Sequence, residues 1–291
     1  MSEGNSVLAA KVAKVIDVST GIWISSRSLV PSISTHLQEA QTVQKQTGQK
    51  QIVPLVVYDL PDRDCAAGAS QGEFSSANGG EAKYQEYITA VASQIRSFSD
   101  VSVAVILEPD SIGNLVSNQG IAFCASGAPV QKRSLAYAIS ILGALPTVSI
   151  YLDAAHATWL GWPDNLAPTA KVVGDIYAAA KQLNPNAIAR GLSTDDQGRS
   201  GNQNVTRRST DWCNFRYAGL GIRPTASTGN SLLDAILWVK PPGESDGNSN
   251  PTSSHYDINC ASNTSYIPSP DPGSWISGAF RSMVELATPP L

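Results

Sequence analysis

Residues 101–110 read Val-Ser-Val-Ala-Val-Ile-Leu-Glu-Pro-Asp, a short apolar stretch followed by two acidic side chains. The run Val101–Leu107 is rich in β-branched residues and almost continuously hydrophobic, which is typical of a strand buried on both faces of a sheet. Glu108 and Asp110 follow it directly. The stretch therefore predicts a central strand of a parallel sheet with carboxylates at its carboxyl end.

Similar apolar runs occur on both sides of this stretch, at Ile52–Tyr58, Val148–Leu152, Ala187–Leu192 and Ala235–Val239. Residues with helical spacing lie between several of them, and one apolar face is formed by Tyr84, Tyr87, Ile88, Val91 and Ile95. A second such face is formed by Leu135, Ile139 and Leu142. Strands that alternate with helices indicate right-handed βαβ units. The pattern predicts an α/β fold whose parallel sheet is open or closed into a barrel.

Each of the five apolar runs is followed by acidic residues. Because active sites of α/β proteins lie at the carboxyl ends of the strands, we expect these side chains to converge on one site. Acidic residues are also common in ordinary loops, but five strand ends in succession favour a shared role. The residues are Asp59, Asp62 and Asp64; Glu108 and Asp110; Asp153; Asp195 and Asp196; and Glu244 and Asp246.

Composition narrows the functional classes. With 291 residues and 42% hydrophobic residues, the chain can bury one core, so we expect a single domain over residues 1–291. A net charge of -4 with no basic run argues against nucleic acid as a partner. No apolar run approaches the roughly 20 residues that cross a bilayer, so we expect no membrane partner. We expect the protein to be a monomer.

Cofactor signals are missing from the sequence. No Walker loop or GxGxxG motif is present, which argues against a nucleotide cofactor. Asp59, Asp62 and Asp64 could supply oxygen ligands to a cation, but Arg63 within the cluster opposes a positive charge. We therefore expect neither a metal nor an organic cofactor.

The cysteines and two glycosylation sequons suggest an extracellular protein. The four cysteines are even in number and show no CxxC spacing, which favours two disulfides. The sequons begin at Asn204 and Asn263. Met1–Lys14 lacks the apolar segment, about 7–15 residues long, of a secretory signal. We expect a secreted protein, although no signal peptide is visible in this chain.

Several facing carboxylates with aromatic residues nearby fit the needs of glycosidic bond cleavage. One carboxyl group must be protonated to donate to the leaving oxygen, while another stays ionised to serve the attacking water. Indole faces stack well on sugar rings, and four tryptophans lie near predicted loops or strand ends. These are Trp23, Trp159, Trp162 and Trp212. For Trp238, inside a predicted strand, and Trp275, on a predicted final helix, we expect core positions.

A serine esterase is the main rival. Gly68-Ala69-Ser70-Gln71-Gly72 fits the GxSxG pattern of a nucleophile elbow, and Asp153 and His255 follow in the expected order. The elbow requires its serine at a sharp turn between a strand and a helix, but the preceding strand is predicted to end near Leu60. The sequence therefore favours the carboxylate chemistry.

Six ordered segments resemble glycoside hydrolase family 6, of the fungal cellobiohydrolase II type. The likeness extends from about Trp23 to the C-terminus. The segments are Val56–Cys65 (VVYDLPDRDC), Ile106–Ser111 (ILEPDS), Tyr151–His156 (YLDAAH), Asp196–Gly201 (DQGRSG), Asp211–Asn214 (DWCN) and Trp238–Pro241 (WVKP).

The resemblance implies a distorted, incomplete parallel β/α barrel and inverting hydrolysis of β-1,4-glucosidic bonds in cellulose, with release of cellobiose from chain ends. Asp110 matches the general acid. Asp64 matches the residue that raises the pKa of that acid by charge repulsion and orders the attacking water. Asp246 matches the candidate base, at an expected separation from the acid of roughly 6.5–9.5 Å.

The resemblance also implies a set of substrate-binding residues and a disulfide pairing. Tyr58 would press on the distorted sugar and Ser70 would hold a water molecule, which removes the esterase interpretation. Cys65 would pair with Cys124, and Cys213 with Cys260. Polar groups around the sugars would be Arg63, Asp153, His156, Lys240 and Glu244, and glucosyl platforms would be Trp23, Trp159, Trp162 and Trp212.

The chain departs from the family pattern at one place above all. The family carries a long stretch between the segments that match Ala189–Thr194 and Asp196–Gly201, whereas these two nearly abut here. The missing stretch implies that one strand-helix portion of the barrel is absent. The alternative function is therefore an impaired or inactive family member that at most binds β-glucan. The part before Trp23 is short, and we expect no carbohydrate-binding module in it.

Overall fold

A computed structural model of the protein describes residues 6–67, 69–195 and 212–291. The chain divides into two compact units. The first, which we call the sheet unit, consists of Ile22–Ala66 and Gln71–Asp196. The second, which we call the loop unit, consists of Met1–Gly21, Ala67–Ser70 and Gln197–Leu291. Each unit is described by itself.

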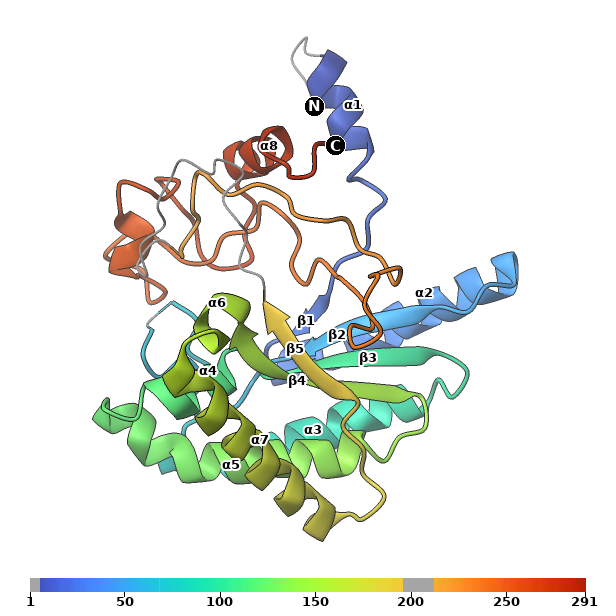
Figure 1. The fold of residues 1–291 in the computed structure, drawn as a ribbon, viewed down its shortest axis with the longest axis vertical. Coiled ribbons are helices and arrows are strands. Elements are labelled where there is room, and N and C mark those ends of the chain that lie inside the picture. The colour runs from blue at the N-terminus through green and yellow to red at the C-terminus, as the bar shows by residue number, and fades with distance from the viewer. Residues whose placement is uncertain (1–5, 68, 196–211) are drawn as a thin grey trace. The chain divides into compact units, whose positions relative to one another are not determined.

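Five parallel strands in sequential order form the centre of the sheet unit (Figure 1). Their mostly apolar, β-branched sequences suit strands that are covered on their faces. The predicted runs at 52–58, 101–107 and 148–152 all form strands. The strands are β1 (Ile22–Ile24), β2 (Ile52–Val57), β3 (Ser102–Leu107), β4 (Val148–His156) and β5 (Gly191–Asp195).

The register of the sheet aligns the carboxyl ends of the strands. Val57 of β2 pairs with Ile24 on one side and Leu107 on the other, and Leu107 pairs in turn with Leu152. Leu152 pairs with Leu192 in β5. The residues that follow this row therefore emerge at one edge of the sheet, among them Tyr58, Glu108 and Asp153.

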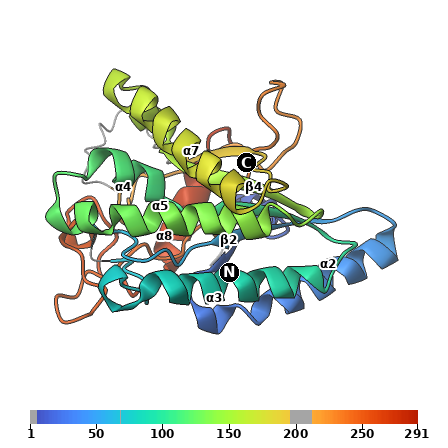
Figure 2. The same ribbon diagram turned by 90° about the horizontal axis from the view of Figure 1, so that it is seen from below.

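Helices cover the sheet and complete its core. The predicted apolar face of α3 (Gly80–Arg96) is confirmed, since Tyr84, Tyr87, Ile88, Val91 and Ile95 are all buried. In α5 (Ala122–Leu142) the three predicted core residues are buried as well. Both helices contribute to one apolar cluster with strand residues. Helix α5 contacts both α3 and α7 (Pro163–Leu183), and Figure 2 shows these three helices side by side.

The other helices of the sheet unit are shorter or lie nearer its edge. Helix α2 (Ser32–Thr47) contacts β2 and α3 and ends at Gly48, whose φ of 71° is the left-handed conformation that favours glycine. The short elements that follow strand ends are η1 (Arg27–Leu29), η2 (Ser76–Asn78), α4 (Ser111–Ser117) and α6 (Ala157–Leu160).

In its described residues the loop unit contains α1 (Ser6–Ala13), η3 (Ile258–Ala261) and α8 (Ser277–Glu285). Isolated bridges connect its loops in place of a sheet. Helices α1 and α8 contact each other, and a small apolar cluster joins the two ends of the chain. The buried members of this cluster are Leu8, Val15, Leu220, Val284 and Ala287.

Three sequence expectations differ from the structure. The apolar run 235–239 forms no strand: among the described residues it makes isolated bridges to Thr20 and Thr225, and no described segment pairs with it over consecutive residues. Strand β5 begins at Gly191, since the preceding residues form the connection from α7. Trp275 precedes α8 and is 51% exposed, so it is not a core residue. Trp238 is half-buried against the small apolar cluster.

Replacing Ile88 by Ala should lower the free energy of unfolding by about 2–5 kcal/mol, because Ile88 is fully buried between α3 and the sheet and its loss leaves a cavity. Denaturant titration would measure the change. Lys83→Ala on the exposed face of the same helix is the matched control and should change stability by less than about 0.5 kcal/mol. Equal losses in both variants would contradict the assigned core.

Candidate active site

Four of the acidic residues that follow β2 and β3 share an uncommon backbone conformation. Positive φ angles occur at Asp62 (53°), Asp64 (51°), Glu108 (52°) and Asp110 (63°). Left-handed backbone costs energy for residues other than glycine, and such residues cluster at functional sites. Their conformation directs the chain sharply away from β2 and β3, so that the side chains lie at the edge of the sheet.

The turn after β2 holds an aromatic and charged cluster. The Tyr58 hydroxyl donates a hydrogen bond to Asp64 Oδ2, and the Arg63 guanidinium lies 4.2 Å from the centre of the Tyr58 ring. The edge of the Trp23 indole packs against the same ring, with centroids 5.3 Å apart. Burial, and then the Asp64 charge, raise the pKa of Tyr58 well above its usual value. Tyr58 therefore keeps its proton and remains a donor to Asp64.

Asp153 fixes the chain around Asp110. Its Oδ1 accepts hydrogen bonds from the backbone N–H groups of Asp110 (2.9 Å) and Ala155 (3.0 Å). Its Oδ2 accepts one from the Ser193 hydroxyl at 3.3 Å, so the carboxylate connects β3, β4 and β5. Asp153 is almost fully buried, whereas Asp110 is exposed. The arrangement presents the Asp110 carboxyl to solvent on a fixed backbone.

Glu108 connects β3 to the turn after β2, a role that the sequence did not reveal. Its carboxylate is fully buried and accepts hydrogen bonds from the backbone N–H groups of Asp59 and Leu60 and from the Tyr84 hydroxyl. Burial raises the pKa of Glu108 to about 7, although these donors oppose the shift. Only its position directly after a strand could have suggested this role.

Asp59 is a fully buried carboxyl group whose neighbours are one cation and two further carboxyl groups, Glu108 and Glu73. The nearest cation is the Arg63 guanidinium, whose Nη1 lies 3.5 Å from Asp59 Oδ1. Burial raises the pKa of Asp59, the Arg63 charge opposes the shift, and the Glu108 charge and a hydrogen bond with Glu73 add to it, which together place the pKa at about 8. Asp59 is therefore protonated in the folded protein at neutral and acidic pH.

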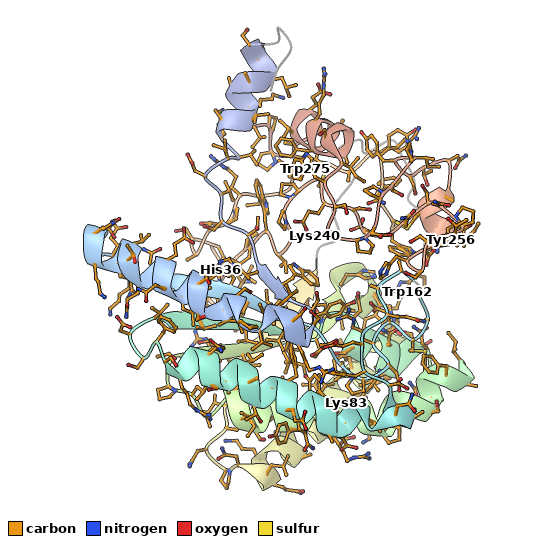
Figure 3. The ribbon with its side chains drawn as sticks, turned by 180° about the vertical axis from the view of Figure 1, so that it is seen from behind. His36, Lys83, Trp162, Lys240, Tyr256 and Trp275 are labelled. Atoms are coloured by element: carbon orange, nitrogen blue, oxygen red, sulfur yellow. A yellow bond between two sulfur atoms is a disulfide. The ribbon has the colours of Figure 1, made fainter. Side chains whose placement is uncertain are left out.

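Aromatic residues and a histidine follow β4. The backbone N–H of Trp159 donates to His156 Nδ1 at 3.2 Å, and the Trp159 indole donates to the Ser117 hydroxyl at 2.8 Å. These bonds fix the half-buried Trp159 ring. Trp162, directly before α7, is 68% exposed (Figure 3). An exposed, rigidly attached indole is suited to stacking on a sugar ring.

The loop unit holds the other predicted site residues, centred on Asp246. Lys240 Nζ lies 2.5 Å from Asp246 Oδ1 and also donates to the Ser245 carbonyl oxygen at 3.0 Å. The Asn214 backbone N–H donates to Asp246 Oδ2 at 2.8 Å, and the Asp246 N–H donates to Asn214 Oδ1 at the same distance. These bonds to a lysine and to the Asn214 backbone fix the orientation of the Asp246 carboxyl group.

The surroundings of Asp246 are rigid. Asn214 follows Cys213, which is joined to Cys260, and a Cβ on Gly247 would lie 2.6 Å from the Cys260 sulfur. The close contact excludes any larger residue at Gly247. Burial raises the pKa of Glu244, the Lys240 charge lowers it, and the Asp246 charge raises it again. Trp212 and Ser70, also in this unit, are half-buried.

The structure contains both disulfides that the resemblance implied, Cys65–Cys124 and Cys213–Cys260. In contrast, Ser70 does not form an esterase elbow: it lies in a turn, well after the end of β2 at Val57. Asp196 lies outside the described residues, as does the sequon at Asn204. Within the described ranges, no three or more His, Cys, Asp or Glu side chains gather in a way that could hold a metal ion.

Comparison with known proteins decides the family. The sequence matches the family described as Glycosyl hydrolases family 6 over residues 1–195 and 194–287. The chain belongs to this family. Exoglucanase 3 from Agaricus bisporus is 39% identical over 330 residues, covering 99% of this chain and 74% of the relative. The 1,4-beta-D-glucan cellobiohydrolase C of Emericella nidulans is 35% identical over 332 residues, covering 98% and 72%.

Solved family 6 structures share the fold. The CcCel6A catalytic domain in complex with p-nitrophenyl beta-D-cellotrioside is 39% identical and superposes with a TM-score of 0.92 over 99% of this chain and 92% of that chain. CcCel6C from Coprinopsis cinerea is 34% identical, with a TM-score of 0.93 over 99% and 91%. The family 6 chain is therefore a glycoside hydrolase with an incomplete parallel β/α barrel.

The comparisons also bear on the missing stretch. The alignment with Exoglucanase 3 extends over 330 residues, whereas this family 6 chain has 291. The two segments that match the family meet at residues 194 and 195, next to the place where the long stretch of the family is missing from this sequence. The described residues contain no helix long and apolar enough to cross a membrane.

Replacing Asp59 by Asn should reduce the loss of stability that occurs as pH rises from about 4 to about 8. Between the ordinary Asp pKa of 3.8 and about 8, the folded chain holds a proton on Asp59 that the unfolded chain has lost. The free energy of unfolding therefore falls as pH rises through this window. Asn stays neutral at every pH, so the variant should be about 1–3 kcal/mol more stable than the original protein at pH 8 and similar to it at pH 4.

Thermal unfolding at a series of pH values would measure this difference. Asp17→Asn, at an exposed position, is the control for the change in net charge. Because Glu108 also has a raised pKa, of about 7, the Asp59 variant should keep a smaller decline between pH 4.5 and 7. Parallel stability curves for the variant and the original protein would contradict the assignment.

Proposed function

We propose that this protein hydrolyses β-1,4-glucosidic bonds of cellulose with inversion of configuration and releases cellobiose from chain ends. The names of its relatives, exoglucanase and cellobiohydrolase, support the substrate and the exo mode of action. The observation that carries the proposal is an exposed carboxyl, Asp110, on a fixed strand end whose neighbour is the Tyr58–Asp64 pair.

Asp110 is the proposed general acid. The charge of Asp110 contributes to the raised pKa of Tyr58, so the Asp110 carboxyl lies near the Tyr58–Asp64 pair. An ionised Asp64 in that position raises the pKa of Asp110 and helps it to hold the proton that the leaving oxygen needs. Tyr58 holds the Asp64 carboxylate in place through its hydroxyl.

Asp246 is the proposed base, with Ser70 as a ligand for the attacking water. Lys240 forms an ion pair with Asp246, and the Asn214 backbone N–H fixes the orientation of the Asp246 carboxyl group. In this proposal the sugar rings stack on four tryptophans, while polar side chains contact the hydroxyl groups. The tryptophans are Trp23, Trp159, Trp162 and Trp212, and the polar residues are Arg63, Asp153, His156, Lys240 and Glu244.

We further propose that both units act as one catalytic domain and that the protein is a secreted monomer. The family match covers residues of both units, which supports a single domain. The two disulfides support an oxidising compartment. Asn263, the start of the second sequon, is exposed in a turn and is a suitable acceptor for a glycan.

Replacing Asp110 by Ala should reduce the release of reducing sugar from amorphous cellulose at least about a hundredfold, because general acid catalysis is lost. The original protein should release mainly cellobiose, and NMR of the fresh product should show the α-anomer. Asp17→Asn serves as a control for a surface change. If the folded original protein releases no sugar, hydrolysis is excluded, and a cellulose pull-down then tests the binding-only alternative.

A further inference from the structure

Two backbone N–H groups directly after β2 are buried and cannot bond within the sheet. They belong to Asp59 and Leu60, which are 0% and 1% exposed. Both donate to the Glu108 carboxylate: the Leu60 N–H at 3.0 Å to Oε2, and the Asp59 N–H at 3.1 Å to Oε2 and 3.2 Å to Oε1. Buried N–H groups without a partner are costly, so this acceptor determines where the turn lies.

Glu108 is itself fixed by hydrogen bonds of its main chain and its side chain. Its own N–H donates to the Val57 carbonyl oxygen at 2.8 Å, and its carbonyl oxygen accepts from the Ser111 N–H at 3.2 Å. The Tyr84 hydroxyl of α3 lies 2.9 Å from Oε1. The side chain is 0% exposed, so no water competes for these bonds. The main chain and the side chain of Glu108 therefore both connect β3 to β2.

We propose that Glu108 is a positioning residue that sets the distance between the Asp64 and Asp110 carboxyls. Asp64 lies at the far end of the turn that begins at Asp59, and Asp110 lies two residues after Glu108. The Glu108 bonds to this turn thus connect the segments that carry the two carboxyls, with Asp153 fixing the other side of Asp110. The inference rests on the proposed roles of Asp64 and Asp110. It adds a positioning role for Glu108, a residue that the proposed function does not use.

We call the hydrogen bonds from the Asp59 and Leu60 N–H groups to the Glu108 carboxyl the clamp. The clamp does not require a negative charge on Glu108. Oε2 can accept both backbone N–H groups in either protonation state, and a proton on Oε1 would point to the Tyr84 hydroxyl oxygen. A glutamine amide reproduces this pattern, with its oxygen toward the turn and its NH₂ group toward Tyr84. A methionine has a similar length but accepts hydrogen bonds only weakly. The pair of variants therefore separates hydrogen bonding from size and charge.

Glu108→Met should lower kcat at least about tenfold with KM changed less than threefold, since a misplacement of about 1 Å can cost a hundredfold in rate. The reaction would be cellohexaose hydrolysis by the full chain well below its unfolding temperature. Glu108→Gln should keep kcat within threefold. Tyr84→Phe removes the hydroxyl donor to Oε1 and leaves both backbone donors of the turn, so this matched control should also stay within threefold.

The pH profile distinguishes positioning from a merely structural role. If Glu108→Met moves Asp64 away from Asp110, the acid loses charge repulsion, so the basic limb of kcat/KM should shift to lower pH. Glu108→Gln should not shift it. A variant that is only less stable would lose activity without a shift of that limb. An unshifted limb with unchanged kcat in Glu108→Met would overturn the proposal.

Hydrogen exchange gives a readout that does not depend on activity. In Glu108→Met the peptide that contains Asp59 and Leu60 should exchange faster, while peptides from α7 should be unchanged; in Glu108→Gln both should match the original protein. If the turn is protected from exchange to the same extent in Glu108→Met as in the original protein, the proposed role of Glu108 is wrong. If the original protein is inactive but the exchange results hold, the proposed function fails and the clamp remains.

Discussion

The structure of the candidate site depends on how the buried backbone donors beyond the strand ends are satisfied. Parallel strands pair regularly along their length, but the chain must leave the ladder where each strand ends, and the first N–H groups there are still buried. Carboxylates of neighbouring strands accept these bonds: Glu108 serves the turn after β2, and Asp153 serves Asp110 after β3. Glu108 and Asp153 thereby hold in place the segments that carry Asp64 and Asp110, the two residues with proposed catalytic roles.

The division between structural and exposed acids explains what the sequence could predict. The apolar runs at β2, β3 and β4 are long enough for period and composition to indicate strands, and the α3 face follows from 3-4 residue spacing. Glu108 and Asp110 are two residues apart in the same motif, yet one is fully buried and the other exposed. Both positions have positive φ angles, so the alternation of a strand does not continue through them, and no composition rule reveals such angles.

The positions that the sequence predicted wrongly or did not predict have a common physical origin. The run 235–239 has strand-like residues but no partner segment within the part of the chain that the structure describes. A three-residue strand such as β1 is too short to show a periodic pattern. The sequence did not predict that Asn214 holds Asp246. An amide that binds a carboxylate through reciprocal backbone bonds has no characteristic sequence spacing. The long-range pairing of segments, and not local propensity, decides these positions.

The small apolar cluster that joins α1 to α8 bears on the order in which the chain folds. The sheet unit is built from strands that follow one another in sequence, so most of its pairings can form as soon as β5 has left the ribosome. Leu8 and Val284 meet across nearly the whole chain, so the loop unit must wait for the last residues of synthesis. Until then the first helix has no core partner, and a chain released early would carry a nearly finished sheet beside an unfolded second unit.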